Sequence, residues 1–115
     1  MEIAQGELET RVKREKISLA VALALSGKWE EASAVNEELL SFFPNEVETL
    51  NRLGKAYLEM ARYPKAREAF GRALSVSPHN TIAKKNLERL AHLHGEGPAP
   101  TYSRKATPDL FIEES

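Results

Sequence analysis

The sequence contains no cysteine and one tryptophan, and aromatic residues make up only 7% of its 115 residues. The lack of cysteine excludes disulfide bonds and thiolate metal or redox sites. His92 and His94 are two residues apart and point away from each other on a helix, so they do not form a metal site. There is no glycine-rich phosphate loop, and no serine or carboxylate has a base at motif spacing. We therefore expect no enzymatic activity, no cofactor and no bound metal.

Long hydrophobic runs and a strong net charge are also missing. The most apolar stretch, residues 17–25, is about half as long as a membrane-spanning helix. Residues 1–7 lack the basic-then-apolar order of a signal peptide. A net charge of −1 gives no overall attraction to nucleic acid or to an anionic membrane. These features predict a soluble, cytoplasmic protein with neither a nucleic-acid nor a membrane partner.

The clearest periodicity lies in residues 47–80. Apolar residues recur there at helical spacing on both sides of a turn, and the set is Leu50, Leu53, Tyr57, Ala66, Phe70, Ala73 and Leu74. Gly54 and Ala66 are small, which allows two helices to approach closely. Pro64 suits the first turn of a helix, and Ser77-Pro78 favours the end of one. The pattern predicts two helices joined by a short turn.

This segment resembles the tetratricopeptide repeat, a unit of roughly 34 residues that forms two antiparallel helices. The resemblance rests on the order Leu53-Gly54, Tyr57, Ala66, Phe70, Ala73 and Pro78. It implies an all-α fold of helix-turn-helix repeats stacked as a right-handed superhelix. It also implies a non-catalytic module that binds a protein or peptide segment.

A shift of 34 residues reveals an earlier copy of the pattern, because Leu19 falls on Leu53, Ala20 on Gly54 and Pro44 on Pro78. Lys16 and Asn36 depart from the family pattern in this copy. We expect about five helices and an irregular C-terminal tail. The predicted segments are an N-terminal extension of the first helix at residues 1–12, repeats at 13–46 and 47–80, a capping helix at 81–94, and a linker with a docking-type tail at 95–115.

Two local features suggest how the helices begin and pack. Asn45, with Glu48 three residues later, predicts an N-terminal cap for the helix that follows. Trp29 stands at a turn between helices, and we expect it to pack the corner there rather than to bind a ligand.

In the resembling family, the first helix of each pair lines a concave groove. The corresponding positions here are Arg14, Ile17, Val21, Ala24, Leu25, Glu48, Asn51, Lys55, Leu58, Glu59, Ile82, Lys85, Arg89 and His92. The principal candidates for partner contact are Ile17, Val21, Asn51, Lys55, Leu58, Lys85, Arg89 and His92. Ile17 and Val21 occupy positions where a carboxylate-clamping repeat has polar residues, so the full clamp is absent. The alternative is that the basic residues form solvated helix faces.

The tail carries an apolar cluster, Leu110, Phe111 and Ile112, within an acidic frame that includes Glu113. We expect this cluster to dock in the groove, either in the same chain or in a second copy. Residues 17–25 are apolar nearly all the way round, which predicts burial on both sides of that helix. The tail, a second copy in a homodimer, or a different protein are the candidates for the second side. A self-associating structural unit and an accessory domain of a larger protein are the alternative functions.

Overall fold

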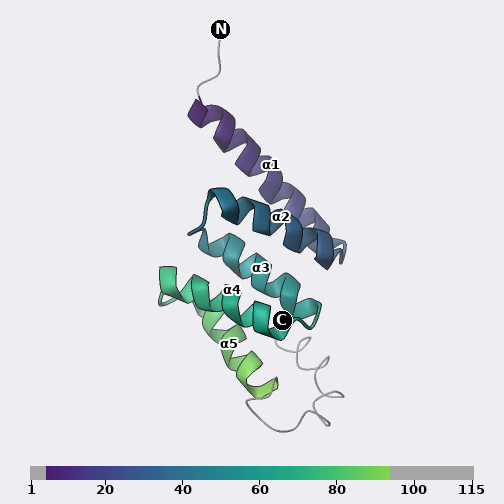
Figure 1. Ribbon diagram of the computed structural model, residues 1–115, viewed down its shortest axis with the longest axis vertical. Helices are drawn as coiled ribbons and strands as arrows, with labels where there is room; N and C mark the ends of the chain where they lie inside the picture. The colour runs from purple at the N-terminus through teal and green to yellow at the C-terminus, as the bar shows by residue number, and fades with distance from the viewer. Residues whose placement is uncertain (1–4, 94–115) are drawn as a thin grey trace.

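The protein is a stack of five helices, described for residues 5–93 in a computed structural model (Figure 1). The helices are α1 (Gln5–Leu25), α2 (Trp29–Phe42), α3 (Val47–Glu59), α4 (Tyr63–Val76) and α5 (Thr81–Leu93). Each helix packs on the next in chain order, and no strand occurs in this range. The predicted all-α fold of successive helix pairs is confirmed. The tail with Leu110, Phe111, Ile112 and Glu113 lies outside the described residues, so its docking stays a prediction.

The turns inside the two helix pairs have the same backbone hydrogen bonds. After α1, the Lys28 N–H donates to the Leu23 carbonyl at 2.8 Å, and after α3 the Arg62 N–H donates to the Tyr57 carbonyl at 2.8 Å. Both turns contain a residue with positive φ, Gly27 at 73° in the first and Ala61 at 59° in the second. A left-handed residue just past a helix satisfies the last carbonyls of that helix. The internal repeat is therefore present in the backbone as well as in the sequence.

The core is centred on the close approach of α3 and α4. Phe70 of α4 is fully buried, and its ring lies over Gly54 of α3, where a Cβ atom would stand only 2.6 Å from the ring. Around this contact lie the buried side chains Leu40, Leu50, Leu53, Tyr57, Leu58, Ala66, Ala69, Ala73, Ala83 and Leu90. The core thus draws on α2 and α5 as well as on the central pair.

A polar contact also joins the two helix pairs. The Tyr57 hydroxyl of α3 donates a hydrogen bond to the Glu37 carboxylate of α2. Burial, together with this hydrogen bond, raises the pKa of Tyr57 to about 12. The hydroxyl therefore stays protonated and keeps donating at any physiological pH.

The start of α3 differs from the N-terminal cap that the sequence predicts. Asn45 does not cap α3, because the N-cap residue is Glu46 and no side chain makes the cap hydrogen bond. The Glu46 carboxylate instead pairs with Lys13 of α1 at 2.7 Å. At the equivalent position before α5, the Asn80 side chain does cap, since its Oδ1 accepts the Ala83 N–H at 2.9 Å. The prediction for Asn45 is wrong because α3 begins at Val47, which leaves Asn45 one residue before the N-cap position.

Helix α1 is the least buried element. Ala20 is its one buried residue, and Leu19, which corresponds to the buried Leu53, is 46% exposed. Leu53 packs in the buried core together with Leu40 of the preceding helix α2, whereas within the described residues no element precedes α1. The sequence predicted burial on both sides of residues 17–25, but within the described residues both sides of α1 are partly open.

We predict that Gly54→Ala destabilises the protein by about 1–3 kcal/mol, because the added methyl group overlaps the Phe70 ring. The matched control is Gly71→Ala in the neighbouring helix, where nothing lies within 4 Å of the new Cβ. That change should stabilise the protein by about 0.5–1 kcal/mol, since alanine is the better helix residue. Urea unfolding followed by circular dichroism measures both, and equal effects would contradict the proposed packing.

A second prediction concerns the left-handed turn residue after α3. Ala61→Gly should raise the free energy of unfolding by about 0.5–1 kcal/mol, because glycine adopts positive φ without the steric cost that alanine carries. The reciprocal change, Gly27→Ala in the equivalent turn, should lower it by a similar amount. Thermal melts of both variants test this, and a loss of stability in Ala61→Gly would show that the turn is not strained.

Candidate functional site

An open groove of about 530 Å³ runs across α1, α3 and α5, with two residues contributed by α2. Its lining residues are Val21, Ala24, Leu25, Trp29, Asn36, Glu48, Asn51, Arg52, Lys55, Ile82 and Asn86. The walls are mainly apolar, and the charged groups are concentrated on α3. The arrangement suits a ligand that carries apolar side chains and a few polar groups.

Helical spacing explains why these residues meet. Glu48, Arg52 and Lys55 lie four and three residues apart, so they share one face of α3. Val21 and Leu25 lie four apart on α1, and Ile82 and Asn86 lie four apart on α5. Figure 1 shows α3 between α1 and α5 in the stack, so α3 supplies the floor and the outer helices supply the walls.

The buried Asn36 and the partly buried Arg52 support the floor of the groove. Asn36 of α2 is 1% exposed; its Nδ2 donates to the Ala32 carbonyl at 3.0 Å, and its Oδ1 accepts from Arg52 Nε at 3.3 Å. Arg52 also donates from Nη2 to Thr49 Oγ1 at 2.9 Å. Burial lowers the pKa of the Arg52 guanidinium, and the charges of Glu48 and Glu46 oppose that shift. Where the family pattern has an aromatic residue, this chain has Asn36, whose side chain accepts a hydrogen bond from Arg52 of the next helix.

Asn51 brings an unused acceptor to the same floor. Its side chain is 8% exposed, and its Nδ2 donates to Asn80 Oδ1 at 3.0 Å, which ties α3 to the start of α5. The Asn51 Oδ1 atom is buried and has no hydrogen-bond donor among the described residues. A buried acceptor without a donor costs free energy, so this oxygen lowers the stability of the floor without being offered to the groove.

Lys55 is the charged residue of the groove best placed to meet a ligand. Its ammonium group pairs with Glu59 at 2.8 Å and lies 6.0 Å from the centroid of the Trp29 ring. An i,i+4 pair on a partly exposed helix face contributes only about 0.3–0.5 kcal/mol. A carboxylate on a ligand can therefore compete with Glu59 for Lys55 at little cost.

The structure brings half of the predicted groove residues together. Those that line the groove are Val21, Ala24, Leu25, Glu48, Asn51, Lys55 and Ile82. Those that do not are Arg14, Ile17, Leu58, Glu59, Lys85, Arg89 and His92. Leu58 is only 1% exposed and packs in the core, and Lys85 and His92 are exposed on α5 outside the groove. Arg89 donates from Nη1 to Asn86 Oδ1 at 3.2 Å, so it supports a lining residue instead of lining the groove itself.

Four lining residues were not among the predictions: Trp29, Asn36, Arg52 and Asn86. Trp29 and Asn36 were missed because the sequence argument assigned the groove to the first helix of each pair, and both lie on α2. Trp29 is partly exposed and lines the groove, so it does more than pack a corner. The departure of Asn36 from an aromatic pattern was the available signal.

The fold defines a helical repeat protein. Residues 47–80 match the family model described as the tetratricopeptide repeat. No curated protein matches the chain. Repeats of this family generally mediate protein–protein interactions and are generally not catalytic.

Between Gln5 and Leu93, no group of three or more histidine or carboxylate side chains is placed to hold a metal ion. Over the same residues, no helix is both long enough and apolar enough to cross a membrane.

We predict that Asn36→Ala destabilises the protein by about 1–3 kcal/mol, because it removes a buried amide and leaves the partly buried Arg52 guanidinium without one acceptor. Asn86→Ala is the matched control. Asn86 also donates to the carbonyl four residues earlier and accepts from an arginine, but it is not buried. Its loss should therefore change the free energy of unfolding by less than about 0.5 kcal/mol. Chemical denaturation of the two variants measures the difference, and equal values would refute a structural role for the pair of Asn36 and Arg52.

Proposed function

We propose that the groove binds an extended peptide segment that combines large apolar side chains with carboxylates. The observation that carries this proposal is the composition of the groove. Apolar side chains from α1 and α5, with Trp29, face the partly exposed ammonium group of Lys55 across the floor. Apolar surface supplies affinity, and a nearby cation selects for acidic residues.

The exposure of the apolar lining residues supports a binding role. Leu25 is 84% exposed and Ile82 is 55% exposed, although each lies at the edge of a largely apolar hollow. Side chains of this kind gain little from the fold and much from a partner that removes them from water.

The tail of the same chain has the composition that this groove selects. Leu110, Phe111 and Ile112 form an apolar cluster, and Asp109, Glu113 and Glu114 flank it. About 17 residues separate Leu93 from Leu110, a span of up to roughly 58 Å when extended. That is longer than α1, whose 21 residues rise by about 1.5 Å each. The tail is therefore our candidate ligand, bound within the chain or supplied by another copy.

The test is a fluorescence titration of the full chain with a synthetic peptide of residues 101–115. Trp29 is the only tryptophan and lines the groove, so its emission reports occupancy directly. The chain carries Leu110→Ala, Phe111→Ala and Ile112→Ala, which removes its own competing cluster without shortening it. We expect saturable binding that is lost with a Phe111→Ala peptide.

Leu25→Ala in the same chain should weaken peptide binding by about fivefold, because an exposed contact residue is removed while the core is untouched. Val76→Ala is the control, since Val76 is also exposed, at 41%, but does not line the groove. If the chain with Leu25→Ala bound the peptide as tightly as the chain with Leu25, the peptide would bind outside the groove. A folded chain that binds no peptide would overturn the tail as ligand.

A further inference from the structure

A second apolar surface lies at the open end of the stack, away from the groove. Eight large hydrophobic side chains are exposed in the described part of the chain. Three of them, Val21, Leu25 and Ile82, line the groove, and Val76 lies outside it. The other four are Leu8, Val12, Leu19 and Phe42, and we call them the N-terminal edge.

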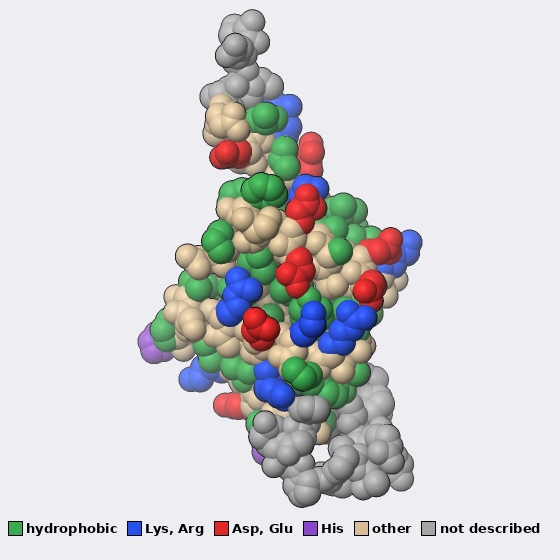
Figure 2. Space-filling model, in the orientation of Figure 1, with side chains coloured by type: hydrophobic (Ala, Val, Ile, Leu, Met, Phe, Trp, Pro, Cys, Tyr) green, Lys and Arg blue, Asp and Glu red, His purple; other side chains and the backbone are tan. Residues whose placement is uncertain are grey.

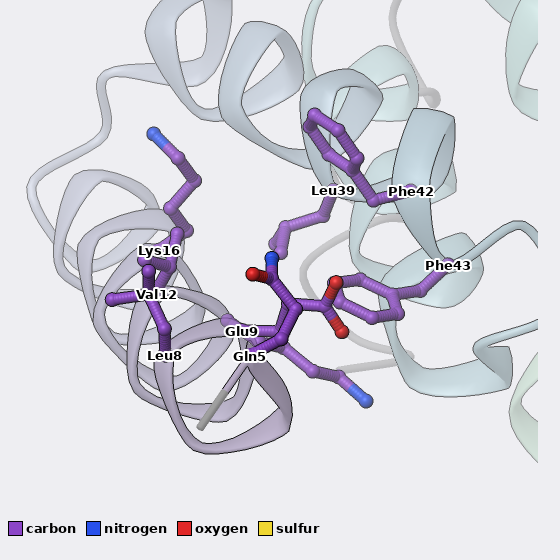
Figure 3. Close-up of a pocket in the computed structure, with 9 residues that line it drawn as sticks. Gln5, Leu8, Glu9, Val12, Lys16, Leu39, Phe42 and Phe43 are labelled. Carbon is purple, nitrogen blue, oxygen red and sulfur yellow. The ribbon is translucent and has the colours of Figure 1, made fainter. Parts of the chain in front are cut away.

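The N-terminal edge is hollowed as well as apolar. A pocket of about 350 Å³ lies between the start of α1 and the end of α2, where Leu8 and Val12 face Phe42 and Phe43 (Figure 3). Phe42 is 68% exposed. Leu19 follows Val12 by seven residues, two helical turns, so it continues the same side of α1. The start of α1 projects beyond the body of the stack, with hydrophobic and charged side chains interspersed along it (Figure 2).

The edge has the construction of an interior stacking face. Leu19 corresponds, at a distance of 34 residues, to Leu53, which is 2% exposed because α2 covers it. Leu19, at the equivalent position of the first helix pair, is 46% exposed. A repeat stack buries its apolar faces against neighbours, and an end that meets water normally carries polar residues. The N-terminal edge lacks that polar covering.

The opposite end of the stack is polar and does not match this surface. The exposed residues of α5 away from the groove are mostly hydrophilic: Thr81, Lys84, Lys85, Glu88 and His92. Head-to-tail stacking of two copies would press this polar face onto the apolar edge. The matching apolar surface on another copy is the same N-terminal edge, and a surface that pairs with itself gives a closed two-fold dimer.

The charges beside the edge are arranged for such self-pairing. Glu9 and Lys16 lie seven residues apart, on the same flank of the apolar stripe, and both line the pocket. In an antiparallel pair of α1 helices that places Leu8 beside Leu19 of the second copy, Glu9 comes close to Lys16 of the second copy. Lys13 is held by Glu46 at 2.7 Å, whereas Glu9 makes no ion pair within residues 5–93. Lys16 pairs with Glu38 at 3.3 Å, and both side chains of that pair are partly exposed, so Glu9 of the second copy can share Lys16 with Glu38 at little cost. The two-fold axis therefore brings opposite charges together twice.

We propose that the N-terminal edge is the contact surface for a second copy of this chain, with the two α1 helices antiparallel. The groove uses the other side of α1, so the dimer presents two open grooves. The contact involves one helix and one helix end from each copy. We therefore expect it to bury less surface than the roughly 800 Å² per partner that is usual in stable complexes. Glu15 also interrupts the stripe between Val12 and Leu19. We therefore expect a reversible dimer with a dissociation constant in the micromolar range.

The test is sedimentation equilibrium of the full chain over a range of concentrations. The unsubstituted chain should show a monomer–dimer equilibrium, because dimer population follows mass action. Leu19→Glu should raise the dissociation constant at least about tenfold, since it brings a charge into an apolar contact. Val76→Glu is the control of similar exposure, 41% against 46%, and should leave it unchanged.

A charge-swap series tests the antiparallel arrangement without depending on Leu19. Glu9→Lys and Lys16→Glu should each weaken the dimer, and the double variant should restore at least part of the affinity lost in Lys16→Glu. A chain that stays monomeric throughout the range overturns the proposal and leaves the edge to a different protein. Larger oligomers would indicate head-to-tail stacking. Loss of the dimer in Val21→Glu but not in Leu19→Glu would place the contact in the groove, which also overturns the proposal.

Discussion

The contact between the Phe70 ring and the backbone at Gly54 sets the distance between α3 and α4, and the rest of the stack depends on it. Only glycine leaves room for the ring at this distance, because a Cβ would stand 2.6 Å from it. With the two helices this close, Leu53 and Tyr57 are presented to α2, and Ala73 is buried at the same junction. The outer helices then pack on surfaces that this central pair has already defined.

Burial falls with distance from that centre, and α1 is the least buried helix. Helix α1 is separated from the α3–α4 contact by α2, and Ala20 is its only buried residue. Both of its apolar flanks remain partly open, one toward the groove with Val21 and Leu25, the other toward the N-terminal edge with Leu19. The residues that contribute least to the stability of the monomer are therefore those with most to gain from a partner.

The groove floor shows how polar groups can be built into a repeat stack. Asn36 and Arg52 join α2 to α3, and Asn51 and Asn80 join α3 to α5, so each hydrogen bond also fixes the placement of a lining residue. Because the hydrogen bonds are directional, these pairs specify how one helix sits on the next more narrowly than apolar contacts do. The buried Asn51 Oδ1 atom is the one acceptor of these pairs that has no donor among the described residues.

The sequence by itself determined the five helices, their pairing and the small residue at the centre of the core, because helical spacing and turn residues are local properties of the chain. It also predicted Val21, Asn51 and Lys55 as groove residues, since each lies on the first helix of its pair, which lines the groove in the resembling family. Only the tertiary structure decided that Trp29 and Asn36 of α2 reach the groove and that Leu58 belongs to the core. The tertiary structure also decided that Glu46, not Asn45, stands at the N-cap of α3 and pairs with Lys13. These outcomes depend on how far apart the helices lie and how they are rotated, which contacts between distant residues fix and local periodicity does not.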